Sequence, residues 1–85
     1  MEQYSGNNVV VDVEAPFVYL GRLEAVREKT VVLEHADVHD LRDSTTTREQ
    51  YVLDAKVHGI QENRRRVAIR MDRIISISLL EDVIA

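Results

Sequence analysis

The chain of 85 residues contains no cysteine and only one proline. The absence of cysteine excludes disulfide bonds, cysteine-ligated zinc and thiol catalysis. No apolar run approaches the roughly 18 residues that a membrane span requires, and we expect no signal peptide ahead of the domain. A cytoplasmic protein that does not associate with membranes is therefore expected.

Enzyme signatures are also missing from the sequence. There is no glycine-rich phosphate loop, no motif context for a Ser-His-Asp triad and no pair of carboxylates that the spacing would bring together. His35, Asp37 and His39 alternate, and with Asp40 they match metal ligands in type. The spacing fixes no further ligand. The favoured interpretation is therefore that these are ordinary polar residues where the chain leaves the core. We expect a non-enzymatic protein without metal or cofactor.

Length and composition predict one domain over residues 9–85, preceded by a flexible polar tail over residues 1–8. Hydrophobic residues make up 45% of the chain, which is enough for a core. A domain of this size buries only a modest fraction of its surface, so association with further copies would stabilise it.

Charge is unevenly distributed along a chain whose formal net charge is −4. Between residues 64 and 73, Asp72 is the only acid among five arginines, which are Arg64, Arg65, Arg66, Arg70 and Arg73. A local basic patch can bind an anion on an acidic protein, whereas the net charge disfavours non-specific binding of nucleic acid. The favoured interpretation of the arginine run at residues 64–66 is a solvated segment, which could pair with acids of a neighbouring subunit. The second interpretation is that these arginines bind phosphates.

Alternation of apolar and polar residues predicts strands at residues 9–14, 17–27 and 31–33. Gly21 inside the second strand predicts a sharp bend or a close approach of two backbones. Phe17 and Tyr19 have the parity of core residues, so a core or subunit contact is expected for them.

A helix is predicted around residues 46–58. Thr46 and Glu49 have the spacing of a capping box, and Gly59 is a plausible stop. Leu53, Val57 and Ile60 form an apolar stripe, which we expect to pack on the chain's own core or on a neighbouring subunit.

The last third predicts two short strands joined by a tight turn. Val67, Ile69 and Met71 alternate before the turn, and Ile75, Ile77 and Leu79 alternate after it. The polar residues at the turn are Arg70, Asp72 and Arg73.

Two stretches of the chain resemble the Sm-like (LSm) family. Residues 17–23 (Phe-Val-Tyr-Leu-Gly-Arg-Leu) resemble the family's aromatic-x-Gly-x-Leu core, and residues 31–36 resemble its following strand. Residues 69–77 (Ile-Arg-Met-Asp-Arg-Ile-Ile-Ser-Ile) resemble its Ile-Arg-Gly-Asp/Asn-x-Ile-x-x-Ile signature. The resemblance implies a mainly β fold: a small, strongly bent, five-stranded SH3-like barrel, with the short helix inserted in the variable loop.

The resemblance also implies a homo-oligomeric ring of about six or seven subunits, in which the last strand of one copy joins the fourth strand of the next. The turn at Met71-Asp72 and the turn at Glu28-Thr30 would then lie near a central pore, where the family binds single-stranded RNA. The nucleic-acid-binding residues that this implies here are Arg70, Asp72, Arg73, Lys29 and Thr30.

The pocket of the family is only partly matched. Met71 stands where the signature has glycine, and residues 27–30 (Arg-Glu-Lys-Thr) replace an expected Asp-x-x-Met-Asn. Arg70 and Asp72 are therefore either RNA ligands or a pair that braces the turn. The missing residues favour an alternative, a scaffolding ring or protein-interaction module that has lost RNA binding, whereas the arginine excess favours RNA.

Overall fold

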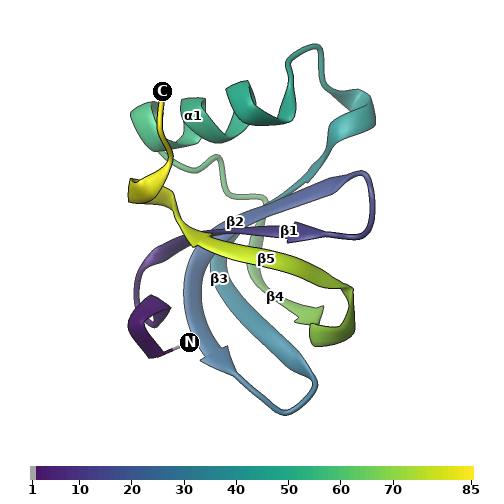
Figure 1. Cartoon of the computed structure of the whole chain (residues 1–85), viewed down its shortest axis with the longest axis vertical. Helices are drawn as coiled ribbons and strands as arrows, with labels where there is room; N and C mark the ends of the chain where they lie inside the picture. Colours follow the sequence, from purple (N-terminus) through teal and green to yellow (C-terminus); the bar gives the residue numbers. More distant parts are fainter. Residues whose placement is uncertain (1) are drawn as a thin grey trace.

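The computed structural model describes residues 2–85, so Met1 of the predicted tail lies outside the described residues. The strands are β1 (Asn8–Val13), β2 (Phe17–Val26), β3 (Thr30–Asp40), β4 (Arg64–Arg70) and β5 (Ile74–Leu79), and the helix is α1 (Arg48–His58). Four short 3-10 turns complete the chain: η1 (Glu2–Tyr4), η2 (Leu41–Asp43), η3 (Met71–Arg73) and η4 (Leu80–Asp82) (Figure 1). The predicted mainly β fold with one inserted helix is confirmed.

All neighbouring strands of the sheet are antiparallel, in the order β4-β3-β2-β1-β5. The two strands on either side of η3 therefore do not pair with each other, contrary to the simple strand pair that the sequence suggests. β4 pairs with β3, β5 pairs with β1, and both are edge strands. The turn η3 connects the two ends of one strongly curved sheet.

The curvature of the sheet depends on a bulge opposite Gly21. One residue of β2 lies there across from two residues of β3, because Leu20 pairs with Asp37 and Arg22 pairs with Glu34. A Cβ atom on Gly21 would lie 3.1 Å from the Cα of Ala36 and 3.1 Å from the carbonyl oxygen of Glu34. The predicted close approach of two backbones at Gly21 is confirmed.

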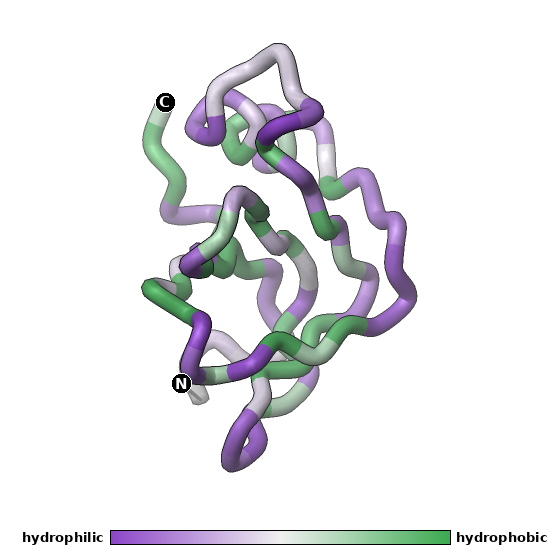
Figure 2. The backbone as a smooth tube through the Cα atoms, turned by 90° about the vertical axis from the view of Figure 1, so that its right-hand side faces the viewer, coloured by the Kyte–Doolittle hydropathy of each residue, from purple (hydrophilic) through white to green (hydrophobic). Residues whose placement is uncertain are grey.

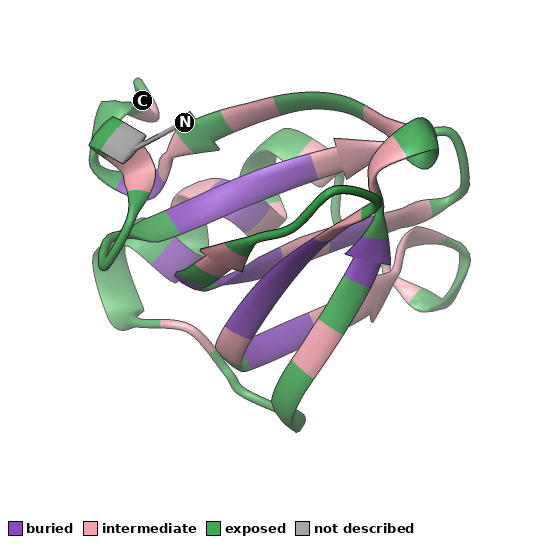
Figure 3. Ribbon diagram, turned by 90° about the horizontal axis from the view of Figure 1, so that it is seen from below, coloured by how far each residue is buried: buried purple, intermediate pink, exposed green. Residues whose placement is uncertain are grey.

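Apolar side chains of β1 and β2 are buried on both faces of the sheet. The first cluster fills the barrel and includes Val9, Val11, Val31, Leu33, Leu23 and Ile69. The second cluster lies between the barrel and α1 and includes Val10, Val18, Leu20, Val52, Ala55 and Leu80. Figure 3 shows this burial concentrated in β1, β2 and β3, whereas β4 and β5 contribute only Ile69 to the fully buried set.

The N-cap of the helix lies one residue later than predicted. Thr47, rather than Thr46, accepts a hydrogen bond at its hydroxyl from the backbone N–H of Gln50, at 3.1 Å. Thr47 and Gln50 have the same capping-box spacing as the predicted pair, which explains the shift. Gly59 ends the helix as predicted, with φ of 95° and a bond from its N–H to the carbonyl of Ala55.

The apolar stripe predicted on the helix packs on the barrel only in part. Val52 and Ala55 are buried against the second cluster, whereas the side of α1 that carries Val57 is open and Val57 is 66% exposed. Packing of the stripe on its own barrel is therefore wrong for Val57, although Ile60 does pack on the second cluster.

Ile75 also departs from the predicted alternation. A register shift between Asp12 and Val13 of β1 places Ile74 toward the barrel, where it packs on the first cluster. Ile75 is therefore 65% exposed, whereas Ile77 and Leu79 pack on the first cluster as predicted.

The described part of the predicted tail runs beside β2. The N–H of Gly6 donates to the carbonyl of Leu23 at 2.9 Å, and the N–H of Leu23 donates to the carbonyl of Asn7 at 3.0 Å. Flexibility of the tail stays a prediction. No helix within residues 2–85 has the length and apolarity needed to cross a membrane.

Candidate nucleic-acid interface

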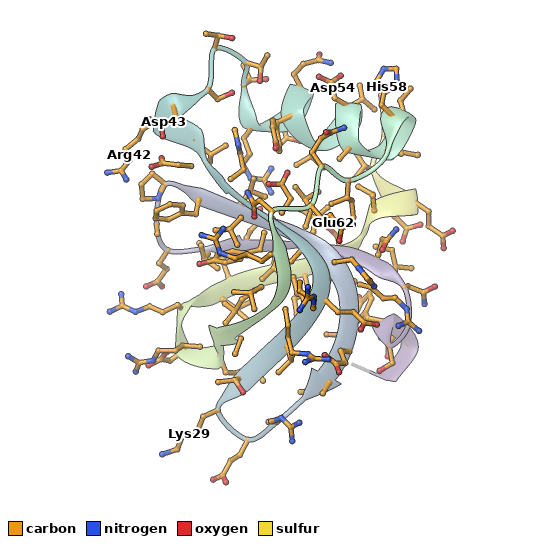
Figure 4. The ribbon with its side chains drawn as sticks, turned by 180° about the vertical axis from the view of Figure 1, so that it is seen from behind. Lys29, Arg42, Asp43, Asp54, His58 and Glu62 are labelled. Carbon is orange, nitrogen blue, oxygen red and sulfur yellow. The ribbon has the colours of Figure 1, made fainter. Side chains whose placement is uncertain are left out.

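Two turns meet at one end of the molecule. The turn between β2 and β3 is closed by a hydrogen bond from the N–H of Arg27 to the carbonyl of Thr30, at 2.8 Å. Lys29 lies at its tip and points away from the body of the protein (Figure 4). This turn is hydrophilic, as the lower end of Figure 2 shows.

The second turn, η3, is hydrogen-bonded directly to the first. The N–H of Met71 donates to the carbonyl of Lys29 at 2.8 Å, and Thr30 is the register partner of Arg70. A hollow of about 690 Å³ lies between the turns and is lined by Glu28, Lys29, Thr30, Arg70, Met71 and Asp72. The structure thus brings four of the five predicted site residues together.

The fifth predicted residue, Arg73, lies on the other side of η3. Its carbonyl accepts a hydrogen bond from the N–H of Glu14 at 2.9 Å. Its side chain lines an adjoining hollow of about 320 Å³, together with Phe17 and Tyr19. Arg70 lines both hollows, so it is the residue that connects them.

Arg70 and Asp72 are paired with each other. Nη2 of Arg70 donates to Oδ2 of Asp72 at 2.8 Å, and their side chains are 70% and 62% exposed. An ion pair this exposed contributes little to stability. The guanidinium keeps further N–H donors and the carboxylate keeps its other oxygen. Formal charges lining the hollow also balance, since Glu28 and Asp72 offset Lys29 and Arg70. A mostly apolar hollow whose charges balance suits a nucleobase better than a polyphosphate.

The predicted basic run divides between two environments. Nε and Nη2 of Arg66 donate to the two carboxylate oxygens of Glu24, at 2.7 and 3.1 Å. This bidentate hydrogen bond holds the pKa of the Glu24 carboxyl below its usual value. Arg22 forms an ion pair with Glu34 on the same outer face of the sheet. Arg66 is therefore part of a cross-strand ionic ladder, whereas Arg64 and Arg65 form no ion pair within residues 2–85.

Asp37 and His39 share the face of β3 that contacts Tyr51, whereas His35 does not join them. His35 adopts a positive φ of 50° at the bulge, and its exposed Nδ1 lies within hydrogen-bond distance of the Glu62 carboxylate, at 3.0 Å. Asp37 is 3% exposed, and the ring of His39 stacks on Tyr51 with centroids 3.6 Å apart. No group of three metal-ligating side chains that could hold an ion occurs among the described residues.

Asp37 belongs instead to a buried polar network that the local sequence does not indicate. The hydroxyl of Tyr51 donates to one oxygen of its carboxylate, and Nδ2 of Asn63 donates to the other at 3.2 Å. Burial and the neighbouring carboxylate raise the pKa of the Tyr51 phenol well above its usual value. The network connects β3, α1 and the segment before β4, which only the folded chain brings together.

The sequence matches no protein-family model and no curated protein. Solved structures do match. The Sm protein of Pyrococcus abyssii in complex with a uridine heptamer superposes with a TM-score of 0.62 at 20% identity, covering 92% of this chain and 89% of that one. The SmAP (LSm) protein of Methanococcus vannielii superposes with a TM-score of 0.61 at 22% identity, covering 92% and 86%.

The chain has the Sm-like fold. A chain in the NatC complex bound to CoA also superposes, with a TM-score of 0.59 at 15% identity, covering 92% of this chain and 80% of that one. The Sm-like barrel predicted from residues 17–23 and 69–77 is thus confirmed. Here it carries α1 in the connection between β3 and β4, where the resemblance placed the variable loop.

Proposed function

We propose that this chain is a non-enzymatic, ring-forming Sm-like protein that binds single-stranded RNA where its two turns meet. The observation that carries the proposal is the hydrogen bond between Met71 and Lys29, which holds the two turns against one hollow. The Sm protein of Pyrococcus abyssii, which has the same fold, is seen with a uridine heptamer.

Each predicted residue has a role in this proposal. Arg70 and Asp72 present donors and an acceptor to the edge of a base, while Lys29 binds a backbone phosphate. Thr30 supplies a hydroxyl from the facing turn. Arg73 extends the interface into the hollow lined by Phe17 and Tyr19, where a neighbouring nucleotide could stack.

Ring formation follows from the unpaired edges. β4 and β5 each have one strand neighbour and expose the other side of their backbones, which is a template for pairing with another copy. Pairing of unlike edges closes into a ring when the rotation between copies is suitable. The resemblance implies about six or seven copies, and we expect them in the cytoplasm.

The alternative is a scaffolding ring that binds protein through α1. Val57 offers an exposed apolar side chain on the outer side of the helix. Asp72 already engages Arg70, and the asparagine that would read a base is replaced by Thr30. This alternative requires no nucleic acid.

Fluorescence anisotropy with labelled oligo-U, a mixed single strand and a duplex distinguishes the two functions. We expect single strands to bind in a salt-sensitive manner, and Arg70→Ala to weaken that binding by about 1–3 kcal/mol. Lys56→Ala is the control, because Lys56 is an exposed cation on α1, and the α1 residues Asp54 and His58 lie at the opposite end of the molecule from Lys29 (Figure 4). Absence of binding by the wild-type protein at low ionic strength would leave the scaffold alternative.

A further inference from the structure

The two edge strands carry unpaired charges of opposite sign at one end each. Arg64 and Arg65 begin β4, and both are exposed. Arg64 makes one side-chain hydrogen bond, from Nη1 to the carbonyl of Asn63 at 3.0 Å. Neither guanidinium has an acidic partner in the described part of the chain.

Glu81 and Asp82 lie beyond the end of β5, separated from it by one residue, in the turn η4, and both are exposed. Within the same described residues, neither forms an ion pair. The cation that shares a hollow with Glu81 is Lys56, and its ammonium donates instead to the carbonyl of Val83, at 2.6 Å. One edge of the sheet therefore begins with two free cations, and the other ends with two free anions.

The direction of pairing decides which charges meet. β4 has seven residues and β5 has six, so the two edges can pair along their full lengths. In an antiparallel pair, the start of β4 in one copy lies beside the end of β5 in the next, which brings Arg64 toward Glu81. A parallel pair would bring Arg64 toward Arg73, where like charges repel. Charge and the better hydrogen-bond geometry of antiparallel strands thus favour the same arrangement.

We propose that Arg64 and Arg65 of one copy form ion pairs with Glu81 and Asp82 of the next copy, and that these pairs fix the direction and register of edge-to-edge assembly. The partner is a second copy of this chain, and the inference rests on the proposed ring. Ion pairs at the rim of an interface act mainly on specificity and on the rate of association, and salt screens them. The strand hydrogen bonds would supply affinity, while the four charges would exclude slipped or reversed pairings.

Charge reversal on the full-length chain tests the inference. Three variants are compared with wild type: R64E/R65E, E81K/D82K and the fourfold combination, which retains the wild-type net charge. Molar mass by light scattering across a dilution series gives the concentration of half-assembly at low and high salt. Circular dichroism and thermal melting check that each variant folds, which we expect because none of the four residues has an ion pair within its own subunit.

We expect each double reversal to raise the concentration of half-assembly by about tenfold or more, and the fourfold variant to restore it. An equimolar mixture of the two double variants should recover assembly, because both kinds of junction between unlike variants bring opposite charges together and the two variants can alternate along the edge-to-edge assembly. Assembly of both double variants at wild-type concentrations would overturn the inference while leaving the ring in place. A fourfold variant that stays dissociated would also overturn the inference while leaving the ring in place. A wild-type protein that is monomeric throughout would overturn the ring itself.

Discussion

Tyr51 donates a hydrogen bond to the buried carboxylate of Asp37, and this bond ties α1 to the middle of β3. The ring of His39 stacks on Tyr51, and Asn63 donates a hydrogen bond to the other oxygen of the Asp37 carboxylate. The helix stands in a connection between two paired strands, so its position on the barrel depends on this network and on the second cluster.

Tyr51→Phe should lower the free energy of unfolding by about 1–3 kcal/mol, because it leaves one oxygen of a buried carboxylate without a donor. Urea denaturation followed by circular dichroism measures the change. Tyr19→Phe is the matched control, since no side-chain hydrogen bond of Tyr19 is present in the structure. Equal losses in the two variants would contradict a specific role for the Tyr51 hydroxyl.

The same bond predicts a dependence on alkaline pH. The pKa of Tyr51 is raised in the folded state, so the native protein favours the protonated phenol. Its stabilising contribution is complete below the ordinary tyrosine pKa of about 10 and is lost as the pH rises above it toward the folded pKa. Melting temperatures measured from about pH 8 to about pH 11 should fall more steeply for wild type than for Tyr51→Phe. Parallel slopes would show that Tyr51 does not contribute.

Gly21→Ala should destabilise the barrel by about 1–3 kcal/mol, because the new methyl group would press on the backbone of β3 and neither strand can retreat without breaking the ladder. Gly59→Ala is the comparison. At Gly59 the backbone conformation is strained for alanine, but nothing lies within 4 Å of the added carbon. Denaturation midpoints should therefore separate a steric clash from a conformational cost. A smaller effect at Gly21 than at Gly59 would contradict the close-approach argument.

His35 occupies a left-handed backbone conformation that costs an ordinary residue about 1–2 kcal/mol. His35→Gly removes that cost and loses only an exposed hydrogen bond with Glu62. His35→Val adds a β-branched side chain, which tolerates a positive φ poorly. We expect the glycine variant to match or exceed wild-type stability and the valine variant to fall below it. The reverse order in thermal melts would show that the bulge changes conformation on mutation.

Local pattern was sufficient for most of the architecture. The spacing around Gly21 indicated a bend or a close approach of two backbones, whereas the five-stranded barrel was implied by the resemblance of residues 17–23 and 69–77 to the Sm-like family. Thr47 and Gln50 show the limit of this approach, since two capping pairs one residue apart fit the same rule and only hydrogen-bond geometry distinguishes them.

The errors come from long-range packing. The apolar stripe of Val57 was predicted to pack on the chain's own core or on a neighbouring subunit, yet within the chain Val52 and Ala55 take the place against the core and Val57 is exposed. Ile75 follows a strict alternation in sequence that a bulge in the pairing of β1 with β5 breaks. Thr30 and Arg70 were placed together by the resemblance, and their register pairing is a property of the sheet that neither turn encodes alone.

Because β1 and β2 are buried on both faces, partial unfolding of the protein can expose an aggregation-prone surface. Local unfolding of α1 would leave the barrel closed around its inner cluster but would uncover Val10, Val18 and Leu20 on the outside. The exposed surface would be a strip of valine and leucine side chains, on strands that remain paired with their neighbours. Such a surface favours aggregation. Detachment of the helix, before global unfolding, is thus the step at which this small barrel becomes prone to aggregate.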